Sequence, residues 1–324
     1  MKISVLVPTY RRVNDLRRCV SALLRQTRIP HEIIVVVRRE DTETIHYAES
    51  LAAAETLLKI MYVDLPGVVQ AMSHGLTAVT GDIVAITDDD SEPFADWLEL
   101  LAEAFEKDSS VAGAGGRDLI YQDGAILDGA ASKVGRLQWF GRMIGNHHLG
   151  TGKAREVDFL KGVNCAYRTE LLRQLGFELR LRGTGAQVHW ELAIGLALKR
   201  MGWKLIYDPF IGVYHYPSTR HDEDKRGEFK PLAAMNAVHN ETLILWGYLS
   251  WTKRIAFILW AVLVGSRTSP GLLQFIRRLA GGGGHAFPLL AASLKGRKLG
   301  IQTWGVSRHE GRHRHAARGL ERRS

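Results

Sequence analysis

Short apolar runs alternate with helical patterns over the first third of the chain. Four apolar runs have the length and continuity of buried strands: residues 2–7, 32–37, 59–63 and 82–87. Four segments that follow them carry apolar side chains at helical spacing: residues 14–26, 44–58, 67–80 and 94–107. Because repeated strand–helix units with short loops connect parallel strands by right-handed crossovers, the pattern predicts an α/β fold with a mostly parallel sheet and flanking helices.

The fourth strand leads directly into three carboxylates, Asp88, Asp89 and Asp90. The helix pattern that follows has Ser91 as its expected cap and Pro93 in its first turn. Ligands of open α/β sheets sit at the carboxyl ends of the strands, and three like charges there repel one another unless something positive binds them. Mg²⁺ and Mn²⁺ prefer such oxygen ligands and usually accompany a phosphate-bearing substrate. The alternative is a solvated turn in which Asp88 caps the helix.

Two further residues indicate a functional site only when they are considered together with this acidic turn. Glu191 opens a helix that ends at Gly202, and a carboxylate in a first turn is already favoured by the helix dipole. His215 follows an apolar strand, where a single histidine is more often packed or solvated than a ligand. No dinucleotide fingerprint, P-loop or GxSxG elbow occurs in the chain.

The net charge of +9 is concentrated towards the C-terminus, since residues 285–324 hold nine Lys and Arg but only two Glu. Such a tail binds an anionic membrane or nucleic acid, or is merely solvated. The two cysteines, Cys19 and Cys165, have apolar neighbours, which predicts buried free thiols in a reducing cytoplasm. The apolar run at residues 2–7 is too short for the core of a signal peptide.

Four segments in this order give the chain a family resemblance: residues 8–12 (PTYRR), 81–90 (GDIVAITDDD), 190–203 (the helix from Trp190-Glu191 to Gly202-Trp203) and 213–215 (VYH). Together they resemble glycosyltransferase family 2, the inverting enzymes of the GT-A fold that use nucleotide-sugar donors. The resemblance covers roughly residues 2–217. It implies a GT-A, Rossmann-like domain with a metal-assisted transfer site.

The resemblance also implies roles for individual residues. The residues that match donor-binding positions are Pro8, Thr9, Tyr10, Arg12, Arg38, Asp41, Asp88 and Asp89. Mg²⁺ or Mn²⁺ would be held by Asp90, with Asp88 and His215 as further ligands. Glu191 matches the base that deprotonates the acceptor hydroxyl.

The chain departs from the family pattern at three places. The second strand ends in Arg38-Arg39-Glu40-Asp41, so Asp41 would read the base one or two positions late. Met72 and Ser73 replace an Arg-Asn pair that contacts phosphate, and Lys161 or Arg38 is a candidate to supply that positive charge. The usual Glu-Asp pair is reduced to Glu191 alone.

Residues 233–300 differ in composition from the preceding part of the chain: they are apolar and aromatic, with interspersed Lys and Arg. The apolar run at 255–265 is 11 residues long, well short of the ~20 that a spanning helix needs. We therefore expect three regions: a catalytic domain at 1–232, helices lying in a membrane interface at 233–300, and a basic, disordered tail at 301–324. The alternative for 233–300 is packing on the catalytic domain or self-association.

These observations predict a metal-dependent inverting glycosyltransferase on the inner face of the cell membrane. It would move a sugar from a nucleotide donor, with UDP favoured, to a hydroxyl of a glycan or lipid-linked acceptor in surface polysaccharide or glycolipid assembly. Transfer to polyprenyl phosphate is an alternative that needs no base. A non-catalytic membrane or nucleic-acid adaptor on a degenerate GT-A fold is another, although no helix-turn-helix or RNA-binding platform supports a nucleic-acid partner. The oligomeric state is left open.

Overall fold

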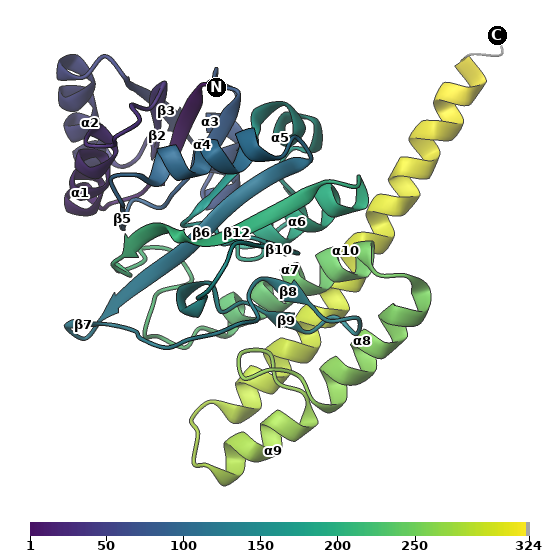
Figure 1. Cartoon of the computed structure of the whole chain (residues 1–324). Coiled ribbons are helices and arrows are strands. Elements are labelled where there is room, and N and C mark those ends of the chain that lie inside the picture. Colours follow the sequence, from purple (N-terminus) through teal and green to yellow (C-terminus); the bar gives the residue numbers. More distant parts are fainter. Residues whose placement is uncertain (322–324) are drawn as a thin grey trace.

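A computed structural model describes the backbone of residues 1–321 and the side chains of residues 1–306. Within these residues a 10-stranded mixed sheet forms the centre of the molecule (Figure 1). Its main path runs β10 (Arg155–Val157), β12 (Lys204–His215), β6 (Val111–Gln122), β11 (Cys165–Arg168), β4 (Ile83–Ile86), β1 (Ile3–Thr9), β2 (Glu32–Arg38) and β3 (Leu58–Val63). Strands β4, β1, β2 and β3 are parallel, as the alternating pattern predicts, so their carboxyl ends meet at one edge.

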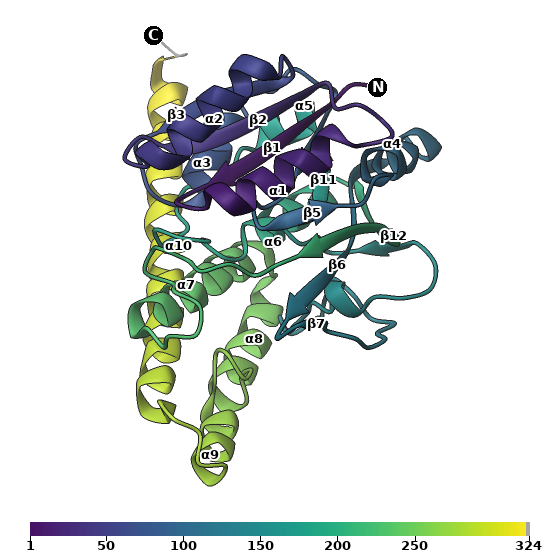
Figure 2. The same ribbon diagram turned by 90° about the vertical axis from the view of Figure 1, so that its left-hand side faces the viewer.

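Helices cover both faces of the sheet (Figure 2). They are α1 (Val13–Leu24), α2 (Thr42–Ala54), α3 (Val68–Gly75), α4 (Trp97–Lys107), α5 (Thr169–Leu175) and α6 (Trp190–Arg200). Side chains alternate between faces along each strand, so Val5 and Val7 pack in the core with α1, α2 and α4, whereas Leu6 packs with α3, α5 and α6. Both faces are therefore buried, which explains why these strands are continuously apolar.

The segment after the three acids differs from the sequence prediction. Ser91 does not cap a helix: it starts β5 (Ser91–Pro93), which pairs antiparallel with the end of β12. Helix α4 begins only at Trp97. Strand β12 is a single strand with a register shift between Asp208 and Gly212, next to Pro209, which lacks a ladder N–H. Pairing with β12, a distant strand, thus overrides the local helix-start signal.

The loop-rich stretch between β6 and β11 carries several short elements. They are β7 (Ala125–Ile126), β8 (Arg136–Leu137), β9 (Met143–Ile144) and a 3-10 helix at His147–Leu149. The β8–β9 hairpin turns at Gly141, whose φ of +89 places the backbone against the ring of Phe257. A Cβ at Gly141 would lie 2.5 Å from that ring, so the hairpin is seated closely on the C-terminal helices.

Four C-terminal helices follow the sheet: α7 (Pro231–Tyr248), α8 (Trp251–Leu263), α9 (Leu272–Ala280) and α10 (Ala286–Glu321). Helix α10 runs along α7, because Gly296 and Gly300 let the backbones approach: a Cβ there would lie 2.5 Å and 2.7 Å from carbonyl oxygens of α7. Both views place α8 and α9 at the end of the molecule farthest from β1–β3 (Figures 1 and 2). None of the helices described combines the length and apolar character needed to cross a membrane.

The low apolar content of the tail predicts disorder from residue 301, but α10 continues as helix through Glu321. Its residues 296–300 pack on α7, and a helix propagates from such a held segment at little further cost. Residues 322–324 of the predicted tail lie outside the described part. The division of the chain at residues 232 and 300 stays a prediction.

Candidate active site

The carboxyl edge of the parallel strands holds a pocket of about 100 Å³. The residues that line it include all but one of those expected to bind the donor: Pro8, Thr9, Tyr10, Arg12, Arg38, Asp88 and Asp89, together with Asp90. Its opposite wall comes from the segment 220–226 that follows β12. The topology therefore brings the ends of β1, β2, β4 and β12 to one site, as the sequence analysis expected for parallel strands.

Asp88, Asp90 and His215 form a cluster with the character of a metal site. One potential ligand atom from each lies within 4.8 Å of the others. The Oδ1 atom of Asp90 and both ring nitrogens of His215 are buried without a hydrogen-bond partner. Buried polar atoms that lack partners carry a large desolvation cost, which a bound cation would offset. Two carboxylates and one imidazole are suitable ligands for Mn²⁺ or Mg²⁺, so the donor set fits a divalent ion.

Positive groups surround Asp90 and offset the repulsion that the acidic triplet implies. Its Oδ2 atom accepts hydrogen bonds from Arg226 and from the backbone N–H of Ser218, both at 3.0 Å, and from Arg12 at 3.3 Å. Burial alone would raise the pKa of Asp90, but His215, Arg12 and Arg226 hold it below its ordinary value. Burial alone would lower the pKa of His215, but the carboxylates of Asp118 and Asp90, 3.5 Å and 3.4 Å from its ring nitrogens, raise its pKa to about 9.

The middle acid, Asp89, joins two loops. It accepts hydrogen bonds from the hydroxyl of Thr9 at 2.7 Å and from Arg12 at 2.8 Å. Its burial raises its pKa to about 7 despite the charge of Arg12. Asp89 therefore ties the β1 loop to the end of β4. Burial and the charge of Asp90 likewise raise the pKa of Asp88, the half-buried member of the metal cluster.

Tyr10 and Arg38 line the pocket together, at the ends of β1 and β2. The guanidinium of Arg38 lies 3.9 Å from the centre of the Tyr10 ring. It also donates two hydrogen bonds to Asp222, at 2.9 Å and 2.6 Å, and one to the carbonyl of Thr184 at 2.7 Å. Arg38 thus links β2 to the segment after β12, and its charge is already paired.

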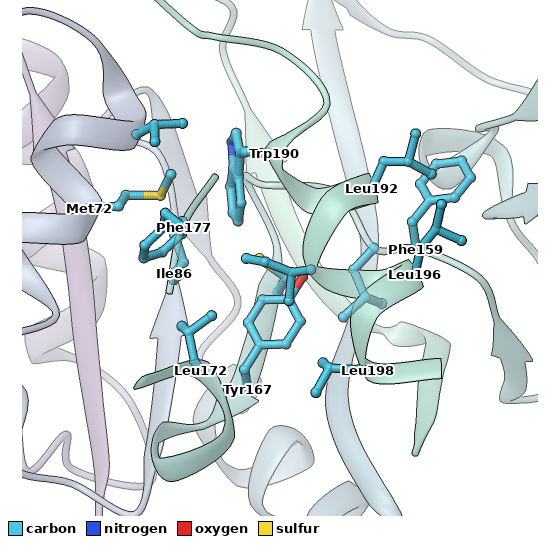
Figure 3. Packing of buried hydrophobic residues seen from close by; sticks show 14 of the residues in the cluster. Met72, Ile86, Phe159, Tyr167, Leu172, Phe177, Trp190, Leu192, Leu196 and Leu198 are labelled. Atoms are coloured by element: carbon cyan, nitrogen blue, oxygen red, sulfur yellow. The ribbon is translucent and has the colours of Figure 1, made fainter. Parts of the chain in front are cut away.

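Asp41, expected to read the donor base, does not line the pocket. It is buried at the start of α2, where its carboxylate accepts hydrogen bonds from the backbone N–H groups of Thr44 and Arg11. These contacts are typical of a helix N-cap. The capping role of Asp41 explains why it lies later in the sequence than the base-reading acid of the family pattern. Met72 also faces away from the donor, because it is fully buried in the core between α3 and the sheet (Figure 3).

Glu191 lies in the first turn of α6, as predicted. Its Oε1 atom accepts a hydrogen bond from the backbone N–H of Gly162 at 2.9 Å. Burial, helped by the charge of Asp88, raises the pKa of Glu191 above its ordinary value. Its neighbour Trp190 packs edge-on against Phe177, with ring centres 5.8 Å apart (Figure 3). This packing anchors the first turn of α6, to which Glu191 belongs.

Several charged residues at the site were missed by the sequence analysis. Asp118 on β6 is fully buried, pairs with Lys161 and lies 3.5 Å from the Nδ1 atom of His215. Lys161 is therefore paired with a neighbour of the metal cluster. Arg220 and Arg226 line the donor pocket. The dense run of charges at residues 220–226, directly after the strand that carries His215, was the available signal for this segment.

Comparisons with known proteins agree with this geometry. The family model described as "Glycosyl transferase family 2" matches residues 4–176. The chain is 26% identical over 180 residues to the glucosyl-dolichyl phosphate glucuronosyltransferase of Haloferax volcanii, covering 54% of this chain and 55% of that protein. The chain thus spans about half the length of this relative.

Solved structures share the fold, among them the following two. GalNAc-T7 with UDP, GalNAc and Mn²⁺ has a TM-score of 0.58 and 16% identity, covering 76% of this chain and 48% of that one. The mannosyltransferase PcManGT from Pyrobaculum calidifontis, in complex with GDP-Man and Mn²⁺, has a TM-score of 0.55 and 19% identity, covering 92% and 84%. At these identities the likeness concerns the fold, and the predicted GT-A architecture is confirmed.

Proposed function

Because this chain belongs to glycosyl transferase family 2, we propose that it is a metal-dependent inverting glycosyltransferase with a nucleotide-sugar donor and a hydroxyl acceptor. The observation that carries the proposal is the cluster of Asp88, Asp90 and His215 beside a pocket at the carboxyl edge of the sheet. An adaptor that does no chemistry has no use for a buried carboxylate oxygen of Asp90 and buried ring nitrogens of His215 that lack hydrogen-bond partners at this edge.

Different residues of the pocket would bind different parts of the donor. Thr9, Tyr10 and Arg12 would contact the nucleoside, and Asp88, Asp90 and His215 would hold Mg²⁺ or Mn²⁺. When bound, the ion offsets the negative charge that develops on the departing diphosphate. Arg220 and Arg226 line the same pocket, where they pair with Asp224 and Asp90, and they would offer the diphosphate positive charge that the Met72-Ser73 pair lacks.

Glu191 would act on the acceptor. Its carboxylate takes the proton of the acceptor hydroxyl while that oxygen bonds to the anomeric carbon, and the bond from this carbon to the diphosphate breaks. One displacement inverts the configuration and needs no second carboxylate as nucleophile. The raised pKa of Glu191, caused by its burial, suits a group that must accept a proton near neutral pH.

Nucleotide binding tests the metal assignment. Wild-type protein should bind UDP in the presence of Mn²⁺ or Mg²⁺, lose most of that affinity on addition of a chelator, and slowly release UDP from a UDP-sugar. Asp90→Asn should abolish the metal-dependent part of binding. Asp96→Asn removes the same charge from an exposed position outside the pocket and should change nothing. UDP affinity that ignores both chelator and Asp90→Asn would exclude this metal site.

The acceptor is proposed to be a saccharide on a lipid carrier. The Haloferax relative is named for action on glucosyl-dolichyl phosphate, in which a sugar is attached to a lipid phosphate. A hydroxyl acceptor requires a base, and Glu191 supplies one. Transfer to a bare polyprenyl phosphate, the second candidate, would leave the perturbed carboxylate of Glu191 without a task.

The outer faces of α8 and α9 support attachment to a membrane. Along α8 an apolar stripe repeats every four residues, and its side chains are exposed by 71%, 51%, 55% and 52%: Trp251, Ile255, Leu259 and Leu263. Helix α9 has no buried residue and continues the apolar surface with Leu272, Ile276 and Leu279. Residues 242–300 contain eight Lys and Arg and no acid. Apolar side chains flanked by basic ones fit an anionic bilayer, here the inner face of the cell membrane.

Liposome flotation tests this attachment. The protein should float with phosphatidylglycerol vesicles, less with neutral ones, and high salt should release part of it. Ile255→Ser combined with Leu259→Ser should weaken partitioning by at least about tenfold, because each side chain is half exposed and would be buried in lipid. Leu179→Ser, an exposed leucine elsewhere, is the control. A protein that ignores vesicles but forms a dimer disrupted by the same double substitution would show self-association instead.

A further inference from the structure

A second cavity, of about 570 Å³, lies between α7, the turn that joins α8 to α9, and the β8–β9 hairpin. Its apolar part comes from α7, α8 and α10, including Val238, Trp260 and Leu289. Three arginines line it as well: Arg142 from the hairpin, Arg267 from the turn and Arg278 from α9. Three hydroxyl side chains of the same turn complete the polar part, Ser266, Thr268 and Ser269. Apolar walls with a few convergent polar groups are typical of small-molecule sites.

The charge of this cavity is positive and unbalanced. Within the described part of the chain, neither Arg142 nor Arg267 donates a side-chain hydrogen bond or forms an ion pair. Glu241 is the one acid among the lining residues, and it is already paired with the buried Arg297 at 3.3 Å. Free guanidinium groups beside hydroxyls are suited to phosphate oxygens, which Arg binds in a bidentate manner.

The cavity is linked to the catalytic base through a short strained turn. His189 lines the cavity, has a φ of +79 and lies two residues before Glu191. At the other end of this turn, Gln187 has a φ of +41, and its side chain accepts a hydrogen bond from the N–H of Val69 at 3.0 Å, next to the donor pocket. Such backbone strain in non-glycine residues is typical of functional segments. Along the chain, the turn therefore leads from the donor pocket at Gln187, past the cavity at His189, to the base at Glu191.

The cavity also borders the membrane-facing helices. Arg278 belongs to α9, whose exposed apolar residues Ile276 and Leu279 are its near neighbours in sequence. An amphiphile whose hydrocarbon chain remains in the bilayer could therefore place its polar head among the arginines. A ligand with only a charged group would leave the apolar walls unused, and a ligand with only an apolar chain would leave the arginines unused.

We propose that this cavity binds the phosphate or diphosphate group of the lipid carrier, so that the attached sugar reaches Glu191. The inference rests on the proposed function, since it names how the acceptor of that reaction is held. The carrier phosphate is not a reactant here: it positions the acceptor, and the transfer step itself is unchanged.

Calorimetry with geranyl diphosphate, a short water-soluble amphiphile, tests the cavity. The titration is done in chelator with the full chain. The protein should bind geranyl diphosphate more tightly than inorganic pyrophosphate and show no binding of geraniol. Arg142→Gln with Arg267→Gln should weaken binding by about tenfold for each arginine, because each loses a charge-assisted hydrogen bond. Lys133→Gln with Lys153→Gln removes the same charge from exposed positions outside the cavity and should change affinity less than twofold.

Several results would overturn the proposal. Equal losses in both double variants would indicate general charge attraction, and no loss in the arginine variant would place the ligand elsewhere, including the donor pocket. Pyrophosphate that binds as tightly as geranyl diphosphate would make this a free-anion site. UDP release from a UDP-sugar by the unsubstituted protein reports on the proposed function separately. Release without geranyl diphosphate binding sinks only the cavity assignment, whereas binding without release sinks only the proposed reaction.

Discussion

Glu191→Gln removes the expected proton acceptor while it keeps the size of the side chain. The amide oxygen of Gln can still accept the hydrogen bond that the N–H of Gly162 donates at 2.9 Å. The packing of Trp190 on Phe177, in the same first turn of α6, is untouched. The substitution therefore separates the chemistry of the carboxylate from its structural contact.

The two expected effects differ greatly in size. Loss of a positioned base lowers a rate by about 10²- to 10⁴-fold, which corresponds to roughly 3–5 kcal/mol of barrier. In the folded protein, a charge-assisted hydrogen bond becomes a neutral one, a loss of about 1 kcal/mol. Removal of a desolvated charge near Asp88 acts in the opposite direction. We expect a free energy of unfolding that changes by less than about 1 kcal/mol while the rate falls at least ~100-fold.

The pH dependence of activity and of stability also tests the role of Glu191, and the direction of each effect follows from its raised pKa. Burial raises the pKa of Glu191, and a base must be deprotonated, so the acidic limb of kcat should lie above the usual range of a glutamate. A pKa that is higher in the folded state contributes stability below the unfolded pKa and loses it as pH rises through the folded pKa. Relative to wild type, Glu191→Gln should therefore gain stability as the pH rises from about 4 to neutral.

The assay measures UDP release from a UDP-sugar with Mn²⁺, donor affinity by calorimetry, and stability by thermal unfolding. Glu170→Gln, an exposed acid in the first turn of α5, is the matched control and should behave as wild type in all three. Donor affinity should be nearly unchanged in Glu191→Gln. If this variant keeps more than about a tenth of the activity, the base lies elsewhere or the acceptor needs none.

Three further outcomes are expected. In metal-free protein Asp90→Asn should lower the melting temperature at pH 7, because His215, Arg12 and Arg226 hold the pKa of Asp90 low. This deficit should begin to shrink only as the pH falls below about 4, the ordinary pKa of an aspartate. A higher melting temperature at pH 7 would mean that repulsion dominates. In a calorimetric panel UDP should bind more tightly than dTDP and GDP, and a tenfold preference for GDP would contradict this. Gly195→Ala should cost about 1–3 kcal/mol in denaturant unfolding, because a Cβ there would lie 2.5 Å from the carbonyl of Asp158; an unchanged midpoint would refute the close packing of α6.

Local sequence patterns were sufficient to predict on which strands and helices the main residues of the site lie. The apolar run of β4 and the helical spacing of α6 depend on contacts two to four residues apart, so the sequence alone placed Asp88 and Asp90 at a strand end and Glu191 in a first turn. Parallel strands then imply a shared carboxyl edge. The general fold was predictable for the same reason, and His215 joined the site through the resemblance of its segment.

Long-range pairing decided the rest. Arg226 reaches Asp90 across 136 residues of sequence, and no local period encodes such a contact. Asp41 became a helix cap rather than a pocket residue because α2 begins there, and Ser91 became part of a strand because the end of β12 lies beside it. The arginine-lined cavity exists only where helices and a hairpin from distant segments meet. The sequence by itself determined which groups stand at the ends of its elements; only tertiary packing decided which of them face one another, because burial and charge pairing act across the whole fold.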